Sequence, residues 1–282
     1  MVGANFYTAV HGRTLHTERN FFGALRVTLD PAGRFRRFYH GTTVHGIQAV
    51  AAERKFEPLA YYHRTGPFGQ ALAAVGAAAD RRPVAVIGLG AGTSICYAKP
   101  GQRWTFYEID PAVLEVARDA GFFSYLRNAT NIAVDYKLGD ARLRLREAPQ
   151  AHYGLIICDA FSSDVPPLHL ITREAMDLYL SKLAPDGLIL FNLSSRYLDF
   201  RSVLGNLAGA CGLYTLSFDE NTLSATDKRA EKYASHWAVL TRHPRYFGAL
   251  LEDDRWQSVL PDAAYKVWTD DYSNLLAIFN WR

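Results

Sequence analysis

The second part of the chain alternates between short apolar runs that suit β-strands and amphipathic stretches that suit helices. Four apolar runs follow one another at 83–88, 104–108, 132–138 and 154–158. A helix is expected from Pro111 to Arg118, with proline in its first turn, and another begins after Thr172. Apolar runs that alternate with helices in this way predict a parallel sheet of the α/β class.

The segment from 185 to the end completes that sheet. A fifth strand is expected at 188–191 after the turn Pro185-Asp-Gly187, followed by a helix near 200–210. Two further β runs, 213–218 and 236–241, have no long helix between them, which predicts an antiparallel hairpin. Five parallel strands plus such a hairpin form a Rossmann-like, methyltransferase-type sheet. The tail, with its tryptophans, is expected to pack back on this body.

The first part of the chain has a different pattern. Strands are expected at 20–29, 34–39 and 44–48, the first two joined by the turn 30–33, whereas 58–69 is irregular and aromatic and 70–79 is helical. We therefore predict an N-terminal β-strand domain over 1–58. Residues 59–282 form a Rossmann-like nucleoside-binding catalytic domain.

Each of the first four parallel strands ends in glycine or a carboxylate. Ligands of open α/β sheets bind outside the carboxyl ends of the strands, so these endings are expected to face one crevice. They are Gly88, Gly90 and Gly92 after the first strand, Glu108 at the end of the second, Asp140 after the third and Asp159 after the fourth.

The chemistry of these endings favours a nucleoside ligand. Glycines let the backbone approach a ligand closely, Glu108 can accept both hydroxyls of a ribose, and Asp140 with the Ala141 N–H can meet the exocyclic amine of adenine. The spacing G-x-G-x-G lacks the extra residue of the pyrophosphate-binding fingerprint, and no phosphate-binding Lys-Ser/Thr follows. S-adenosylmethionine or a relative therefore fits better than NAD. The alternative is structural: helix–strand packing can require glycines, and acids at strand ends often cap helices, as expected for Asp110.

Composition limits the remaining function classes. The 282 residues are 49% hydrophobic and 21% charged, as in an ordinary globular protein, and a net charge of +3 implies no nucleic-acid partner. The basic run Arg142-Leu-Arg144-Leu-Arg146 is expected to be a solvated helix face. Three scattered cysteines suit a cytoplasmic protein, no metal-ligand spacing stands out among nine histidines, and no apolar run approaches the ~18 residues that span a membrane.

From about Phe21 to Leu276 the chain resembles the spermidine/spermine synthase family of polyamine aminopropyltransferases. It is most similar to the spermidine-synthase-like domain of members fused behind a transporter-like membrane region, which often have Asn-Phe-Phe-Gly, here 20–23, after their last membrane helix. We therefore expect such a region upstream, which would make this chain the cytosolic domain of a membrane protein. The resemblance also leads us to expect a homodimer. The motifs that carry the resemblance are Gly41-Thr-Thr-Val-His-Gly-Ile-Gln48, Tyr61-Tyr-His-Arg-Thr-Gly-Pro67, Ile87-Gly-Leu-Gly-Ala-Gly-Thr93, Tyr107-Glu-Ile-Asp110, Gly139-Asp-Ala141 and Asp159-Ala-Phe-Ser-Ser-Asp164.

The resemblance implies transfer of an aminopropyl group from decarboxylated S-adenosylmethionine to a small-molecule amine, without a metal. Glu108 and Ile109 then belong to the ribose site, and Asp140 with Ala141 to the adenine site. The resemblance also gives the roles of the other residues. Gln48 reaches the donor from the N-terminal β region, Asp159 takes the proton of the amine, and Asp164 is a second acid that holds the acceptor. Tyr62 lines the acceptor pocket and is counted with Asp159 as catalytic.

Two departures from the family pattern concern the acceptor. The segment from Asp159 to Asp164 is two residues longer than the Asp-Ser-Ser-Asp of the family. Where synthases have Tyr-His-Glu, this chain has Tyr62-His63-Arg64, so that a guanidinium replaces a carboxylate. We count His63 and Arg64 with the acceptor site; Arg64 would suit an acceptor that bears a carboxylate, or would pair with a neighbouring acid.

Two other functions stay open. A small-molecule methyltransferase would use intact S-adenosylmethionine in the same crevice, with a cationic partner such as Arg64 for the donor carboxylate. A nucleoside- or polyamine-sensing domain of an attached transporter would bind without catalysis, since the fold alone does not decide activity. The retained acids Asp159 and Asp164 favour an enzyme.

Overall fold

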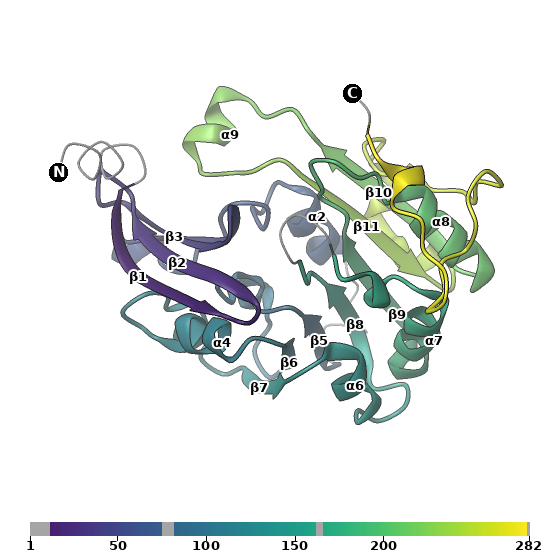
Figure 1. Ribbon diagram of the computed structural model, residues 1–282, viewed down its shortest axis with the longest axis horizontal. Helices are drawn as coiled ribbons and strands as arrows, with labels where there is room; N and C mark the ends of the chain where they lie inside the picture. Colours follow the sequence, from purple (N-terminus) through teal and green to yellow (C-terminus); the bar gives the residue numbers. More distant parts are fainter. Residues whose placement is uncertain (1–11, 75–81, 162–165, 281–282) are drawn as a thin grey trace.

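Two β-sheets of different kinds organise the chain, and they lie side by side in Figure 1. The computed structural model describes residues 12–74, 82–161 and 166–280. The smaller sheet is antiparallel, with its strands in the order of the chain: β1 (Arg13–Asn20), β2 (Gly23–Leu29), β3 (Phe35–His40) and β4 (Thr43–Ala49). The expected strand 20–29 begins three residues late, because Asn20 ends β1 and accepts hydrogen bonds from the N–H groups of Phe22 and Gly23 to form the turn.

The larger sheet has the predicted topology. Its order is β12-β10-β11-β9-β8-β5-β6-β7, and β11 and β10 run antiparallel to their neighbours as the predicted closing hairpin. The short edge strand β12 was not expected. The parallel strands are β5 (Val84–Ile87), β6 (Arg103–Glu108), β7 (Ala133–Leu138), β8 (Tyr153–Cys158) and β9 (Leu183–Asn192); the others are β10 (Tyr214–Glu220), β11 (Ser235–Thr241) and β12 (Gln257–Ser258).

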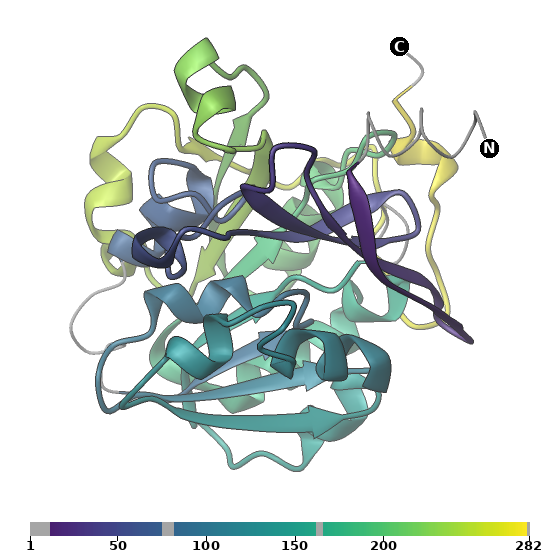
Figure 2. The same cartoon turned by 90° about the vertical axis from the view of Figure 1, so that its left-hand side faces the viewer.

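Helices connect these strands (Figures 1 and 2). The expected helix after Asp110 begins and ends where predicted, with Asp110 accepting a hydrogen bond from the N–H of Ala112 as its N-cap. The helices are α2 (Pro67–Ala74), α4 (Pro111–Arg118), α5 (Tyr125–Asn128), α6 (Ala141–Arg146), α7 (Arg173–Lys182), α8 (Arg201–Ala210) and α9 (Ala225–Arg229), with 3-10 helices η1 (Ala52–Arg54), η2 (Thr93–Tyr97), η3 (Leu168–Leu170), η4 (Pro244–Glu252) and η5 (Leu276–Ile278). Part of the expected helix 70–79 lies outside the described residues.

Alternation along the parallel strands explains why both faces of the larger sheet are buried. On β5, Val84 and Val86 join one apolar cluster, which includes residues of α2 and α4, while Ala85 and Ile87 join another, which includes residues of α6, α7 and α8. Strands buried on both faces read as continuous apolar runs. For this reason the parallel strands could be recognised in the sequence as apolar runs.

Arg142 corrects the expectation of a solvated helix face. Its guanidinium is buried and donates to both carboxylate oxygens of Asp270, at 2.7 and 2.9 Å, and to the His169 carbonyl at 2.9 Å. This hydrogen-bonded pairing holds the pKa of Asp270 at about 2. A bidentate pair fixes geometry, so Arg142 fastens the C-terminal tail, whose Trp256 and Trp268 are buried as expected.

The smaller sheet packs directly on the glycine-rich loop after β5. The Ala91 N–H donates to the His45 carbonyl at 3.2 Å, and a Cβ on Gly46 would come within 2.3 Å of the Ala91 Cβ. Glycine at 46 is therefore what permits β4 to reach the loop. In the part of the chain that the structure describes, no helix is both long and apolar enough to cross a membrane. The division at 58/59 into two domains stays a prediction.

We expect Gly46→Ala to separate the two sheets at this contact. Overpacking of this kind costs about 1–3 kcal/mol, so the free energy of unfolding in urea should fall by that amount. Gly121→Ala is the matched control, because its Cβ would meet only the end of the Asp119 side chain, and it should change the value by no more than about 0.5 kcal/mol. Equal unfolding midpoints for Gly46→Ala and the unmodified protein would refute the close packing.

Candidate active site

Two adjoining cavities open at the carboxyl ends of the parallel strands. All four strand endings line the first cavity, through Gly88 and Gly90, Glu108 and Ile109, Asp140 and Ala141, and Asp159. The structure thus brings together residues that are separated by up to 71 positions, from 88 to 159, in the sequence. Residues from the smaller sheet cover the cavity from the other side: Phe22, Phe38, His40 and His45.

The three glycines of the loop after β5 are required for different structural reasons. Gly88 has φ +95° and Gly90 has φ +53°, and a Cβ would come within 2.4 Å of the Asp159 carbonyl or 2.6 Å of the His45 carbonyl. These two line the first cavity. Gly92, with φ +77°, is not among its lining residues; a Cβ there would strike the side chain of Leu126. Gly92 therefore serves packing.

Glu108 is held at the end of β6 by backbone donors. One oxygen accepts from the Leu89 N–H at 2.9 Å, and the other accepts from the N–H groups of Ile109 and Asp110 at 2.9 and 3.0 Å. Burial raises the pKa of Glu108, and these hydrogen bonds oppose the rise. The carboxylate is fixed in place, and its remaining lone pair, on the oxygen bonded to Leu89, can accept a hydroxyl group from a ligand in the cavity. Ile109 is 46% exposed beside it.

Asp140 both caps a helix and lines the first cavity. Its Oδ1 accepts from the Leu143 N–H at 2.9 Å, as an N-cap of α6, and its Oδ2 contacts His169 Nε2 at 2.9 Å. The structural and functional interpretations of this acid therefore do not exclude each other. Ala141 is the first residue of α6, where backbone N–H groups have no partner within the helix.

Asp159 is the half-buried carboxylate at the end of β8. Tyr62 donates its hydroxyl to Oδ2, and the Asn192 side-chain amide donates to Oδ1 at 2.7 Å. Burial raises the pKa of Asp159 to about 6, and the two hydrogen bonds limit the rise. Burial raises the pKa of Tyr62 well above its usual value, so that hydroxyl stays protonated and acts as a donor. A carboxyl with a pKa near neutrality can accept or give a proton at physiological pH.

The second cavity meets the first at Asp159. Four residues line both cavities: His45, Gly90, Asp159 and Phe161. Beyond them the second cavity is lined by Tyr61 and Tyr62, by Asn192 and the residues after it, and by the facing ends of β10 and β11. Its carboxylates include Asp199, Asp219 and Glu220; Asp199 is paired with Arg201, which also lines the cavity. A ligand in one cavity can therefore reach a ligand in the other across Asp159.

The structure does not bring Gln48 to either cavity. The side chain is 1% exposed, and its amide group donates to the Lys55 carbonyl and to Ser124 Oγ, while its oxygen accepts from the Ser124 N–H. These contacts use three of the four hydrogen bonds that the side-chain amide can form. His45, three residues earlier on β4, lines both cavities, and Thr43 and Val44 line the second.

His63 and Arg64 also lie outside both cavity linings. Arg64 is exposed, and its guanidinium carbon lies 5.3 Å from the centre of the Tyr97 ring, while His63 Nδ1 is 3.0 Å from Thr65 Oγ1. Among the described residues Arg64 forms no ion pair with an acid, and it lines neither cavity, so its role at the acceptor stays a prediction. Asp164 lies outside the described residues.

Sequence reasoning missed three residues of the site. Asn192 ends the fifth parallel strand, so the rule that identified the other strand endings would have identified it too. His45 belongs to a strand whose register the sequence does not fix, and His169 reaches Asp140 through tertiary contact alone. No group of three or more potential ligands that could hold a metal ion occurs among the described residues.

Comparison with known proteins is consistent with this geometry. No family model matches the chain. A curated relative, the polyamine aminopropyltransferase of Vibrio vulnificus, is 30% identical over 134 residues, and the match spans 43% of this chain and 43% of the relative. The match thus covers less than half the length of that relative.

Solved structures show the same fold over almost the whole chain. A probable spermidine synthase from Corynebacterium glutamicum has a TM-score of 0.63 at 17% identity, covering 92% of this chain and 98% of that one. The spermidine synthase from Thermotoga maritima has a TM-score of 0.58 at 14% identity, covering 96% and 86%. A spermidine synthase in complex with the transition state analogue AdoDATO has a TM-score of 0.57 at 13% identity, covering 96% and 85%.

The partial sequence match to a polyamine aminopropyltransferase and the fold shared with spermidine synthases support the resemblance seen in the motifs.

Proposed function

We propose that the protein is an aminopropyltransferase that moves the aminopropyl group of decarboxylated S-adenosylmethionine to a small-molecule amine. One observation carries the proposal: the half-buried Asp159, with a pKa of about 6, lies in the wall shared by two cavities. Such a carboxylate can serve a reaction between two ligands. The curated relative and the structural neighbours, by their names, support the same chemistry.

The first cavity suits the nucleoside donor. Glu108 accepts the ribose hydroxyls, Asp140 and the Ala141 N–H take the adenine amine, and Gly88 and Gly90 let the backbone lie against the ligand. The contacts that Glu108 and Asp140 already make leave at least one lone pair on each carboxylate for these bonds. The donor thereby points its sulfonium toward Asp159.

The acceptor enters through the second cavity. An alkylammonium has no free electron pair, so Asp159 first removes a proton from it. The amine nitrogen then attacks the propyl carbon bound to sulfur: a C–N bond forms, the C–S bond breaks, and its electrons stay on sulfur in neutral methylthioadenosine. Tyr62 and Asn192 hold the carboxylate in place, and positioning supplies much of the rate. Asp164 as a second acceptor-binding acid belongs to this proposal.

The position of Arg64 weakens the case for intact S-adenosylmethionine as the donor. A bare donor ammonium needs a nearby acid, which Asp159 supplies. An intact donor also carries a carboxylate, and Arg64, the cation considered for it, lines neither cavity. A cytosolic location, a homodimer and an upstream membrane region stay predictions from the family resemblance.

A product assay tests this assignment. Incubated with decarboxylated S-adenosylmethionine and a linear diamine, the protein should release methylthioadenosine and aminopropylated amine in equal amounts, measured by mass spectrometry. Release of S-adenosylhomocysteine from intact donor, with a methylated amine, would establish the methyltransferase instead. Tight binding of either nucleoside without turnover of any amine would favour a sensing domain.

Asp159→Asn should separate catalysis from binding. Loss of the base should lower turnover by about 10²–10⁴-fold, whereas the dissociation constant of the nucleoside in calorimetric titration should change little because Glu108 and Asp140 are intact. Glu108→Ala is the reciprocal variant and should weaken nucleoside binding by about 1–3 kcal/mol. Turnover that survives in Asp159→Asn would mean that Asp159 is not the base.

The pH dependence of kcat/KM should report the titration of Asp159. Since the base must be deprotonated, the rate should rise with pH through an apparent pKa of about 6. The Tyr62 hydroxyl lowers that pKa, so Tyr62→Phe should shift the acid limb to higher pH. Tyr136→Phe, which removes a hydroxyl from β7 away from both cavities, is the control and should keep the original limb. A pH-independent rate between 5 and 8 would contradict the role of Asp159.

A further inference from the structure

The segment 59–66 carries Tyr62 into the site without belonging to a regular strand or helix. Its backbone is fastened to the connection between β10 and β11, residues 221–234, which carries α9 and projects from the body in Figures 1 and 2. The Ala60 N–H donates to the Glu231 carbonyl at 2.8 Å, and the Tyr233 N–H donates to the Ala60 carbonyl at 3.2 Å. Ala60 and Lys232 thereby form an isolated parallel bridge.

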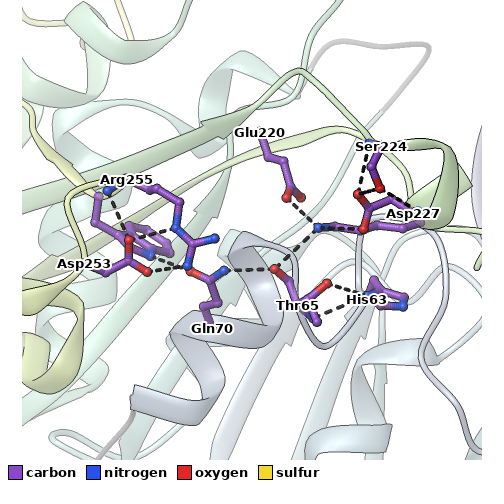
Figure 3. Close-up of polar contacts among 10 residues, drawn as sticks. His63, Thr65, Gln70, Glu220, Ser224, Asp227, Asp253 and Arg255 are labelled. Atoms are coloured by element: carbon purple, nitrogen blue, oxygen red, sulfur yellow. Dashed lines mark hydrogen bonds and ion pairs between the residues drawn. The ribbon is translucent and has the colours of Figure 1, made fainter.

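Lys232 strengthens this junction with a buried charge. Only 4% of its side chain is exposed. The ammonium lies 2.5 Å from Glu220 Oε1 and 3.7 Å from Asp227 Oδ1, and it is 3.5 Å from the Thr65 carbonyl (Figure 3). It therefore joins both ends of the β10–β11 connection to the segment that carries Tyr62.

The partners of Lys232 are themselves fixed. Asp227 shares hydrogen bonds with Ser224 in a capping box at the start of α9. The Thr65 carbonyl also accepts from Gln70 Nε2 at 2.9 Å, which links the segment to α2. A lysine stem with three N–H donors can reach several acceptors at once. Its contacts therefore hold the end of the segment 59–66 close to the end of β10.

This junction also bounds the second cavity. Tyr61 and Tyr62 line it from the segment, whereas Glu220 lines it from the end of β10 and Tyr233 from the β10–β11 connection. Lys232 is not among the lining residues. Any loosening of the junction would change the distance between these two walls and the direction in which the Tyr62 hydroxyl points.

We infer that Lys232 is a positioning residue for the transfer step: its buried pair with Glu220 fixes the segment 59–66 so that Tyr62 donates to Asp159. The inference rests on the proposed function, in which Asp159 is the base. Buried ion pairs often add little net stability compared with apolar residues. A role in placing Tyr62 gives this pair a function that packing alone would not require.

The test is Lys232→Met, which keeps the length of the side chain and removes the ammonium. We expect kcat/KM for the amine to fall by about 10–100-fold, as for small misplacements of reacting groups. The acid limb of kcat/KM should move to higher pH, in the direction of Tyr62→Phe. The dissociation constant of the donor nucleoside should stay within about twofold, because its contacts are distant.

Two further variants complete the experiment. If Lys232→Met does not fold, Lys232→Met with Glu220→Met removes both buried charges and serves in its place. Arg255→Met is the matched control: it removes one positive charge from the exposed pair with Asp253, close to the same network, and should keep the original rate and acid limb.

The outcomes separate the inference from the proposed function. The inference is supported if the acid limb of the pH profile of kcat/KM shifts to higher pH in both Tyr62→Phe and the Lys232 variant. If the acid limb shifts in Tyr62→Phe but not in the Lys232 variant, the inference alone is overturned, even if the melting temperature of the Lys232 variant falls. An unshifted limb in Tyr62→Phe overturns the assignment of Asp159 and Tyr62, and the inference with it.

Discussion

The site depends on one carboxylate and its two hydrogen-bond donors. Asp159 is partly removed from solvent at the end of β8, and a desolvated charge is costly unless it is hydrogen-bonded. Tyr62 supplies one hydrogen bond from the segment before α2, and Asn192 supplies the other from the end of β9. Three stretches of chain must therefore meet at one point, and the two cavities exist because they meet there.

The smaller sheet makes this arrangement possible from the other side. Gly46 lets β4 lie against Ala91, and the same approach places His45 at the wall shared by both cavities. Glycines on each of two facing elements allow such an approach, since a Cβ on either would fill the gap. The glycine-rich loop is thus constrained by the protein as well as by any ligand.

Several elements in the fold were predictable because local chemistry defines them. The helix Pro111–Arg118 has proline in its first turn and Asp110 as its cap, and the parallel strands are apolar on both faces. The start of β2 and of β9 was misjudged for a common reason. Turn-forming residues lie inside or beside these strands, so the start of each strand depends on its hydrogen-bonded pairing with the neighbouring strand. For example, β9 pairs with β8 at Leu183 and again from Leu188, and Pro185-Asp-Gly187 lies between the two paired parts.

The α/β class, the succession of strands along the chain and the acids at the strand ends could be predicted from the amino acids alone, because hydrophobic periodicity and strand-end residues are local features. Which side chains enter the cavities depends on the folded arrangement. Gln48 and His45 lie three residues apart on one strand, yet the first makes its hydrogen bonds in the interior and the second lines the site. Arg142 looked solvated until its partner, 128 positions away, was brought beside it. The strand register and the residues distant in sequence that contact these side chains decide their positions. Neither can be recognised from the few residues around each side chain.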